Sequence, residues 1–348
     1  MPVNIVEADI KRDLDIFLEL LNRNRRNDVG RNRFEWLYLN NPHGYAKAWI
    51  VYDENTQEPV AFTSVLPRLV KVDDYEISCW NCCDFSVDQK YRTLGVAVKL
   101  RRKAKECVDN GDISSLYAHP NDRMKVIHER VGHTPIGEMN RYARVLRSDH
   151  HVHQRVKNRV IANIVSASVN FILKIPDAFF SVDNHYVVQM VGDKKFDDEY
   201  DKLFEDIAGC YKIIGDRRSA YLNWRYIENP LYKCDRMIIR DNHKLVGYII
   251  YYIEGSTAVF KDILCVQDEN ILKTLLFSWI KYLRKKSVHT ISAIFMNTNP
   301  MVAVFQKAGF KIRSEKSSVY AYARKKDEVE PLWLNGENWY MTVGDRDV

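Results

Sequence analysis

The stretch that decides the fold is DFSVDQKYRTLGVAVKLRRKAK, residues 84–105. It begins as an apolar strand, passes through a tight basic loop whose one glycine is Gly95, and continues as a helix. Such a loop leaves backbone N–H groups of the helix N-terminus without partners, and the helix dipole favours an anion there. The stretch therefore predicts a phosphate-binding loop at residues 92–97, which we call the cradle.

The elements on either side of the cradle follow a distinctive order. Before it, the patterns predict a strand at 3–6, helices at 9–22 and 34–40, and strands at 46–52, 59–66 and 75–87. After it come a helix at 96–110 that ends before Gly111, a strand at 115–118, a helix at 121–131, and two strands that end near residue 147.

The cradle and this order together resemble one superfamily. Residues 92–97 fit the pattern Q/R-x-x-G-x-G/A, and with the element order of residues 3–147 they resemble the GNAT superfamily of acetyl-CoA-dependent N-acyltransferases. The resemblance implies an α/β fold with a mixed α+β sheet and acetyl-CoA as the acetyl donor. The cofactor contacts that it implies are Phe85, Ser86, Val87, Arg92, Thr93, Leu94, Gly95, Val96, Ala97 and Asn121.

The second half of the chain repeats the first. Trp36, Tyr38, Asn41 and Pro42 recur 188 residues later as Trp224, Tyr226, Asn229 and Pro230. The span that corresponds to the cradle is QDENILKTLLFSWIKYL, residues 267–283, which has no glycine and carries acids and amides where a pyrophosphate would lie. We therefore expect two tandem GNAT-like domains, of which the second is degenerate and does not bind CoA.

The expected domain limits follow from this repeat. They are a catalytic GNAT domain with the acetyl-CoA site at 1–148, a linker helix packed between the domains within 149–178, a degenerate GNAT-like domain at 179–330, and a tail at 331–348. The tail is expected to dock back on the protein because Trp333, Trp339 and Tyr340 are poor candidates for solvent exposure.

Three side chains are catalytic candidates. GNAT enzymes often carry a tyrosine four residues before the glycine that ends the fourth helix, where it protonates the CoA thiolate; here that position holds His128. A histidine can donate a proton near neutral pH, although a helix histidine without a role fits equally well. Asp84 and His119 are candidates for the base, against a strand anchor and a loop residue as the alternatives. The thioester carbonyl is expected to be polarised by a backbone N–H of residues 85–87.

The resemblance implies an acceptor site at the first helix pair and the ends of the fourth and fifth strands. The residues predicted to line it are Trp36, Tyr38, Arg68, Trp80 and Cys82. Because Trp36 and Tyr38 have counterparts in the second half, a core role is favoured for both. Arg68 is a candidate partner for an anionic substrate, although most charged residues in such positions are simply solvated.

Composition narrows the class of protein. The 348 residues carry a net charge of +6, 46% hydrophobic and 28% charged residues, which is typical of a folded globular protein. Seven cysteines with no paired C-x-x-C spacing, since the one at Cys79 and Cys82 has no second motif to complete it, predict reduced thiols and no metal site. We expect a cytoplasmic monomer or homodimer without membrane insertion, and no nucleic-acid partner, because no dense Lys/Arg run is interleaved with aromatic residues.

The resemblance also suggests an acceptor. The F/L-x-W-x-Y-x-x-N-P entry of each half and the W…GDxD tail are similar to acetyltransferases of bacterial surface-polysaccharide loci, such as those for lipopolysaccharide O-antigen. This implies acetyl transfer to the amine of a nucleotide-linked amino sugar, for example a dTDP-3-amino-3,6-dideoxyhexose. The alternatives are a Fem-type aminoacyl-tRNA-dependent transferase, a peptide or polyamine N-acetyltransferase, and a non-catalytic acetyl-CoA-binding module.

Overall fold

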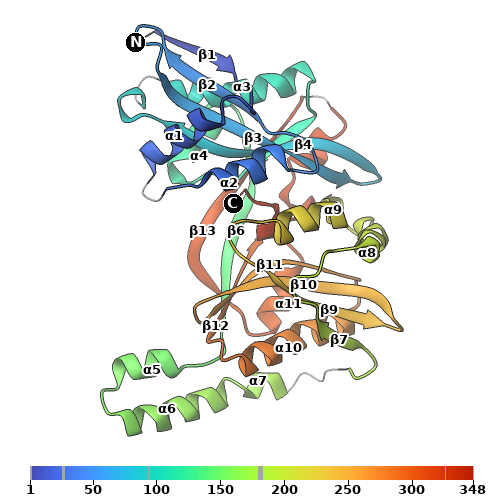
Figure 1. Ribbon diagram of the computed structural model, residues 1–348. Coiled ribbons are helices and arrows are strands. Elements are labelled where there is room, and N and C mark those ends of the chain that lie inside the picture. Colours follow the sequence, from blue (N-terminus) through green and yellow to red (C-terminus); the bar gives the residue numbers. More distant parts are fainter. Residues whose placement is uncertain (1, 26–27, 93–94, 179–182, 326, 348) are drawn as a thin grey trace.

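One mixed sheet runs through the whole protein (Figure 1). The computed structural model describes residues 2–25, 28–92, 95–178, 183–325 and 327–347. Within these ranges the sheet has fourteen strands, twelve of them in the order β1-β2-β3-β4-β5-β13-β6-β12-β11-β10-β9-β7, while β8 and β14 are attached beside β3.

The first half contains the elements predicted for it. They are β1 (Val3–Glu7), α1 (Leu14–Asn24), α2 (Arg31–Phe34), the π-helical turn η1 (Glu35–Leu39), β2 (Lys47–Asp53), β3 (Pro59–Val72), β4 (Tyr75–Val87), the 3₁₀ turn η2 (Gln89–Tyr91), α3 (Val96–Asn110), β5 (Ser115–Ala118), α4 (Asp122–Arg130) and β6 (Thr134–Val145). The prediction of two strands before residue 147 is wrong, because β6 is one continuous strand.

The second half begins with three helices and then repeats the same plan. From residue 149 to residue 307 its elements are α5 (Asp149–Arg155), α6 (Arg159–Ile172), α7 (Ile175–Ala178), β7 (Val187–Met190), α8 (Asp198–Ala208), β8 (Ile213–Gly215), α9 (Ser219–Leu222), the π-helical turn η3 (Asn223–Ile227), β9 (Asp235–Asp241), β10 (Lys244–Glu254), β11 (Thr257–Cys265), α10 (Glu269–Lys285), β12 (Thr290–Met296) and α11 (Met301–Lys307). The chain then continues with β13 (Lys311–Ala323), α12 (Glu330–Trp333), the 3₁₀ turn η4 (Gly336–Asn338), β14 (Trp339–Tyr340) and the 3₁₀ turn η5 (Val343–Asp345).

The two halves exchange their last long strands. β13 pairs with β5 of the first half, with Tyr320 opposite Ala118, and β6 pairs with β12 of the second half, with Val145 opposite Thr290. The two long strands also pair antiparallel with each other. The sheet therefore continues across the boundary expected at residue 148, and β6 stays unbroken because its partners come from the other half.

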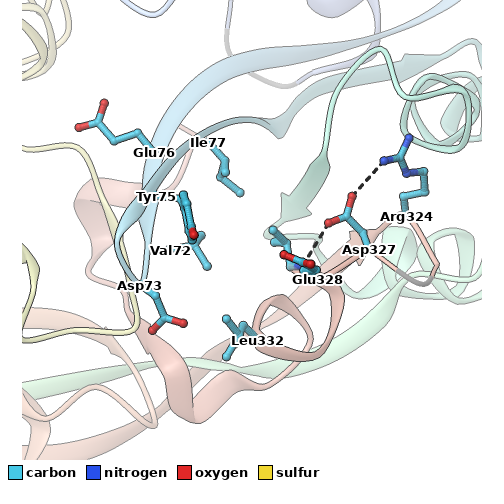
Figure 2. A pocket seen from close by; sticks show the side chains of 10 residues that line it. Val72, Asp73, Tyr75, Glu76, Ile77, Arg324, Asp327, Glu328 and Leu332 are labelled. Carbon is cyan, nitrogen blue, oxygen red and sulfur yellow. Dashed lines mark hydrogen bonds and ion pairs between the residues drawn. The ribbon is translucent and has the colours of Figure 1, made fainter.

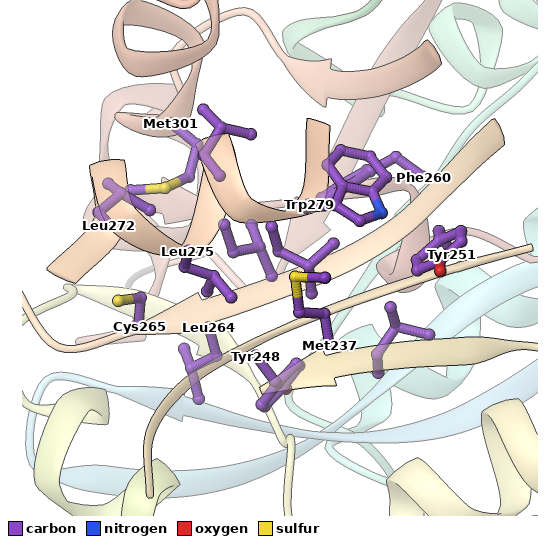
Figure 3. Packing of buried hydrophobic residues seen from close by; sticks show 14 of the residues in the cluster. Met237, Tyr248, Tyr251, Phe260, Leu264, Cys265, Leu272, Leu275, Trp279 and Met301 are labelled. Carbon is purple, nitrogen blue, oxygen red and sulfur yellow. The ribbon is translucent and has the colours of Figure 1, made fainter. Parts of the chain in front are cut away.

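Each half has a helix packed on its sheet. Figure 3 shows Leu272, Leu275 and Trp279 of α10 against strands β9 to β11, and the ring centroids of Trp279 and Tyr251 are 5.3 Å apart. In the first half α3 buries Leu100 and other apolar residues against β2, β3 and β5. This packing fixes the N-terminus of α3, and hence the cradle, beside the end of β4.

The repeated entry motif forms the contact between the halves. Trp36 in η1 donates a hydrogen bond from Nε1 to the carbonyl oxygen of Trp224 in η3 at 2.7 Å, and the reverse bond measures 2.8 Å. Their ring centroids are 5.2 Å apart. Trp36 is therefore placed at the junction of the halves.

The tail lies buried between the halves. Trp333, Trp339 and Tyr340 are each at most 3% exposed, and β14 pairs with β8, which pairs with β3. The Asp345 carboxylate accepts hydrogen bonds from Arg68 of the first half at 3.0 Å and from Arg217 of the second at 2.7 Å. One carboxylate thus joins both halves through the tail.

Helices α5 and α6 form an arm that projects from the sheet (Figure 1). Of the 14 residues of α6, Ala162 and Ser166 are the buried ones. The expectation that this helix packs between the domains is wrong, because the junction is already filled by the tryptophan pair and the tail. No helix in the described part of the chain is long and apolar enough to cross a membrane.

Candidate active site

A small cavity lies where the pairing of β4 and β5 ends. These parallel strands pair from Trp80 with Leu116 to Cys82 with Ala118, and β4 then continues to Val87 with no strand of the described ranges on that edge. The cavity measures about 140 Å³. It is lined by Arg25, Cys82, Cys83, Asp84, Phe85, Arg101, Ala118, His119, Pro120, Asn121, Met124, His128 and Asp347.

The cavity unites many of the residues predicted from the sequence. Cys82, Asp84 and Phe85 come from β4, His119 and Asn121 from the loop after β5, and His128 from α4. Asn121 also caps α4, since its side chain accepts a hydrogen bond from the N–H of Met124 at 3.1 Å. Arg101 and Asp347 also line the cavity, and sequence reasoning missed both.

The cradle presents an open N-terminus on α3, the helix that contributes Arg101 to this cavity. Gly95 is the N-cap of α3 at φ +72°, a conformation that favours glycine, and no side chain in the described ranges caps the helix. Val96 is buried and Ala97 is half-buried. Arg92 folds back, donating from Nε to the carbonyl oxygen of Val87 at 2.9 Å. Thr93 and Leu94, predicted cofactor contacts, lie outside the described residues.

The N-terminus of α10, the corresponding helix of the second half, is capped by a side chain of its own. The carboxylate of Asp268 accepts hydrogen bonds from the N–H groups of Asn270 at 2.7 Å and Ile271 at 3.0 Å. These are the groups that an anion would need. The open N-terminus of α3 and the self-capped N-terminus of α10 therefore distinguish the halves.

Asp84 is a buried and fully paired carboxylate. Arg33 binds it through two nitrogens at 2.8 and 3.1 Å, Arg25 donates to it at 3.0 Å, and the Tyr38 hydroxyl donates at 3.1 Å. Burial acts to raise the pKa of Asp84, but the arginines and the hydroxyl outweigh burial and hold the pKa below its usual range. A carboxylate with four donors is a weak base.

His119 lies in the cavity without hydrogen bonds. It is 8% exposed, and neither ring nitrogen has a partner among the described residues. Burial, and then the charge of Arg346, lower the pKa of His119 well below 6.5. The ring is therefore neutral at pH 7 and offers one acceptor and one donor to a ligand.

His128 is paired with a second histidine. Its Nδ1 lies 2.8 Å from Nδ1 of His133, so one ring donates to the other. Burial, the charge of Arg101 and the neighbouring His133 lower the pKa of His128 well below 6.5. The imidazolium form that a strong proton donor needs is therefore disfavoured at neutral pH.

Arg101 contributes an unpaired charge to the cavity. It is 1% exposed, its Nε and Nη1 have no partner among the described residues, and its guanidinium lies 5.5 Å from the ring centroid of Phe85. A guanidinium keeps its proton inside proteins, and a buried charge without a counterion is costly. The Nε and Nη1 atoms of Arg101 therefore offer donors to an anionic group in a cavity that the carboxylates of Asp84 and Asp347 also line.

Asp347 reaches the same cavity from the tail. Burial raises its pKa to about 6, although Arg346 acts in the opposite direction. The carboxylate is therefore mostly ionised at pH 7 and is basic enough to accept a proton. Asp347 is the last residue of the W…GDxD tail motif, but nothing local places it in the cavity, because the tail lies more than 200 residues beyond the cradle.

The other predicted side chains lie outside this cavity. Trp80 lines a separate hollow of about 500 Å³ together with Tyr45 and Lys47. Arg68 is held by Asp345, and Ser86 donates its hydroxyl to the carbonyl oxygen of Leu20 at 2.7 Å.

A larger hollow lies at the opposite end of β4 (Figure 2). It measures about 710 Å³, and Tyr75, Glu76 and Asp327 are among its lining residues. Tyr75 precedes Asp84 by nine residues along the same strand, which is roughly 30 Å at the usual strand rise. Its acidic lining does not suit a pyrophosphate. In the described ranges, no group of three or more His, Cys, Asp or Glu residues is placed to hold a metal ion.

The comparisons with known proteins identify the fold. No family model matches the chain, and no curated protein is similar to it in sequence. A GCN5-related N-acetyltransferase from Anabaena variabilis superposes with a TM-score of 0.67 at 13% identity, over 92% of this chain and 73% of that one.

Two further structures agree. A tandem GNAT protein from the clavulanic acid biosynthesis pathway gives a TM-score of 0.58 at 14% identity, over 94% of this chain and 100% of that one. N-myristoyltransferase from Saccharomyces cerevisiae with bound myristoyl-CoA gives 0.57 at 12% identity, over 100% and 84%. The chain therefore has the GNAT fold, built twice in tandem around one continuous sheet.

Proposed function

We propose that the protein is an N-acyltransferase that takes the acetyl group of acetyl-CoA and transfers it to an amine. The observation that carries this proposal is the cavity at the end of the β4–β5 pairing, which holds the guanidinium of Arg101 from α3, the helix whose N-terminus is open. The pyrophosphate of CoA would bind at the cradle, and the thioester would reach the cavity.

The side chains in the cavity fit the charges that acyl transfer creates. The amine nitrogen bonds to the thioester carbon, the C–S bond breaks, and sulfur leaves with the bonding electrons as a thiolate. Arg101 would stabilise that thiolate, because two of its nitrogens are free to donate. Among the described residues β4 has no strand partner on one edge beyond Cys82, so the N–H groups that point to this edge would donate to the carbonyl oxygen.

Asp347 is the base that we favour. The attacking nitrogen must lose a proton, and a carboxylate with a pKa of about 6 can accept it at pH 7. Asp84 is less suited, because four donors already bind it. His119 is neutral and unpaired, so it can orient the amine or a water molecule.

For the acceptor we propose the amine of a nucleotide-linked amino sugar, such as a dTDP-3-amino-3,6-dideoxyhexose. The support is the resemblance of the entry and tail motifs to acetyltransferases of surface-polysaccharide loci. A net charge of +6 and the half-exposed Arg25 at the cavity are compatible with a diphosphate-bearing substrate. Peptides and polyamines are the next acceptors to test.

The decisive experiment combines donor binding with product detection. Wild-type protein and Gly95→Glu would be incubated with acetyl-CoA and a panel of dTDP- and UDP-linked amino sugars, polyamines and peptides, and products would be read by mass spectrometry. Gly192→Glu is a matched control, because Gly192 also has a positive φ of +68° with open space around it.

We expect one class of amine to gain an acetyl group with the wild type and the control, but not with Gly95→Glu. If only a peptide or a polyamine is acetylated, the proposed sugar acceptor is wrong, but the proposed N-acetyltransferase activity stands. If Gly95→Glu binds acetyl-CoA as well as Gly192→Glu does, the proposed donor site is wrong.

A further inference from the structure

The arm formed by α5 and α6, residues 149–172, has an unpartnered apolar face. Of the fourteen large apolar side chains exposed in the described chain, six lie on α6 and a seventh, Ile175, follows the arm directly. Phe171 is 70% exposed, and Ile164 and Ile172 are at least 60% exposed. Scattered exposed apolar residues are ordinary, but a continuous apolar helix face marks an interaction surface.

The same segment is strongly cationic. Residues 150–176 contain no aspartate or glutamate, and Arg155, Lys157, Arg159 and Lys174 are exposed. In the described ranges none of these four has an ion-pair partner.

The two acids that flank the segment are already engaged. Asp149 is bound by Arg147, and Asp177 is bound by Arg144 and Arg284. The positive charge of the arm is therefore not neutralised by its own ends.

This combination selects one kind of partner. A nucleic acid would match the cations but leave the apolar face in water, and a second copy of the arm would match the apolar face but bring like charges together. An anionic lipid surface matches both, because apolar side chains enter the acyl-chain boundary while lysines and arginines contact lipid phosphates.

We propose that the arm docks on the surface of an anionic phospholipid bilayer, with α6 lying in the plane of the interface. The binding is peripheral, since no described helix can cross a bilayer. In Figure 1 the arm lies away from the first half, so docking leaves the cavity at β4 and β5 open. The proposal does not depend on the proposed acetyl transfer.

The test is sedimentation of the full chain with vesicles. One set would be pure phosphatidylcholine and the other a mixture of phosphatidylcholine with phosphatidylglycerol. We expect binding to the mixed vesicles alone, weakening as salt rises because screening reduces the attraction. Equal binding to both sets, or binding to neither, would overturn the proposal.

Two variants separate the apolar and the charged contributions. Ile164→Asp with Phe171→Asp is expected to reduce vesicle binding at least tenfold, and so is Lys157→Gln with Arg159→Gln and Lys174→Gln. The matched control is Ile253→Asp, an exposed apolar side chain on β10 outside the arm, which should bind as the wild type does. Thermal melting would verify that all variants are folded.

Light scattering in solution without lipid tests the main rival. A monomer that binds the mixed vesicles supports the proposal. A wild-type dimer that Ile164→Asp with Phe171→Asp converts to a monomer, combined with no vesicle binding, would assign the arm to self-association instead.

Discussion

Trp36 and Trp224 hydrogen-bond each other reciprocally, each indole N–H donating to the backbone carbonyl of the other, at 2.7 and 2.8 Å. The same tryptophan of each repeat thus supplies both donor and acceptor, and the halves meet through a local two-fold relationship. This explains why the motif is repeated although only the first half has an open cradle.

Replacing either tryptophan by phenylalanine should destabilise the whole protein. Each change leaves one buried carbonyl without its donor, which costs about 1–3 kcal/mol in the free energy of unfolding. Equilibrium urea unfolding would measure it. Trp279→Phe is the matched control, because Trp279 is also buried but its Nε1 has no partner among the described residues, so only packing is lost. Equal losses in all three variants would refute a role for the hydrogen bonds.

Arg101→Met should slow acyl transfer according to the leaving group. Loss of the charge that stabilises the thiolate is expected to lower kcat with acetyl-CoA by about 10²–10³-fold. Two short acetyl thioesters distinguish this from a structural effect: the N-acetylcysteamine ester, with a basic thiolate, and the 4-nitrothiophenol ester, with a stable one. The defect should be large for the first and small for the second. A uniform defect would indicate that Arg101 only supports the fold.

Asp347 should set the acid limb of the pH profile. Because its pKa is raised to about 6, the wild-type rate should rise as pH increases through about 6, where the carboxylate becomes ionised and able to accept a proton. Asp347→Asn should lower kcat and remove this limb, while the KM for acetyl-CoA stays unchanged. An unaltered profile in the variant would transfer the role of base to His119 or to water.

Asp345→Asn should weaken the junction of the halves. The change removes the carboxylate that Arg68 and Arg217 share. Arg217 keeps the buried Asp262 at 3.0 Å, but Arg68 loses the one ion pair that it makes among the described residues, which costs about 3–5 kcal/mol in the free energy of unfolding. Burial opposes ionisation of Asp345, but the two arginines lower its pKa. Its stabilisation is therefore present above the unfolded-state value and is lost as pH falls through the lowered one.

An exposed ion pair provides the control for this variant. Asp73 and Lys212 are 2.9 Å apart with the lysine side chain 63% exposed, so Asp73→Asn should cost less than about 1 kcal/mol. Comparable losses in Asp73→Asn and Asp345→Asn would argue against the bridging role of the tail.

The sequence predicted what local patterns can encode. Gly95 needs its positive φ and α3 needs an apolar face, so the cradle and its helix were recognisable from residues 84–105. The exchange of β6 and β13 was not, because alternation shows that a strand has two faces but not which strand lies beside it. The arm was misplaced for a related reason, since an apolar helix is normally buried and the pattern alone does not name its partner.

Arg101 and Asp347 were not found from the sequence for the same reason. Arg101 lies within a helix full of lysines and arginines, and only the fold shows that it is the buried one. Asp347 enters the cavity through the path of the tail, which depends on Asp345 meeting two arginines that are 149 positions apart in the chain.

The exchange of strands also has a consequence for folding during synthesis of the chain. When the ribosome has produced the first half, β5 has an unpaired edge at Ala118, and its partner at Tyr320 does not yet exist. The nascent first half must therefore wait with an open sheet, which slows folding and exposes an edge that other chains can join. A fragment that stops at residue 148 should aggregate when expressed alone, and chaperones should matter more to this protein than to a single-domain GNAT protein.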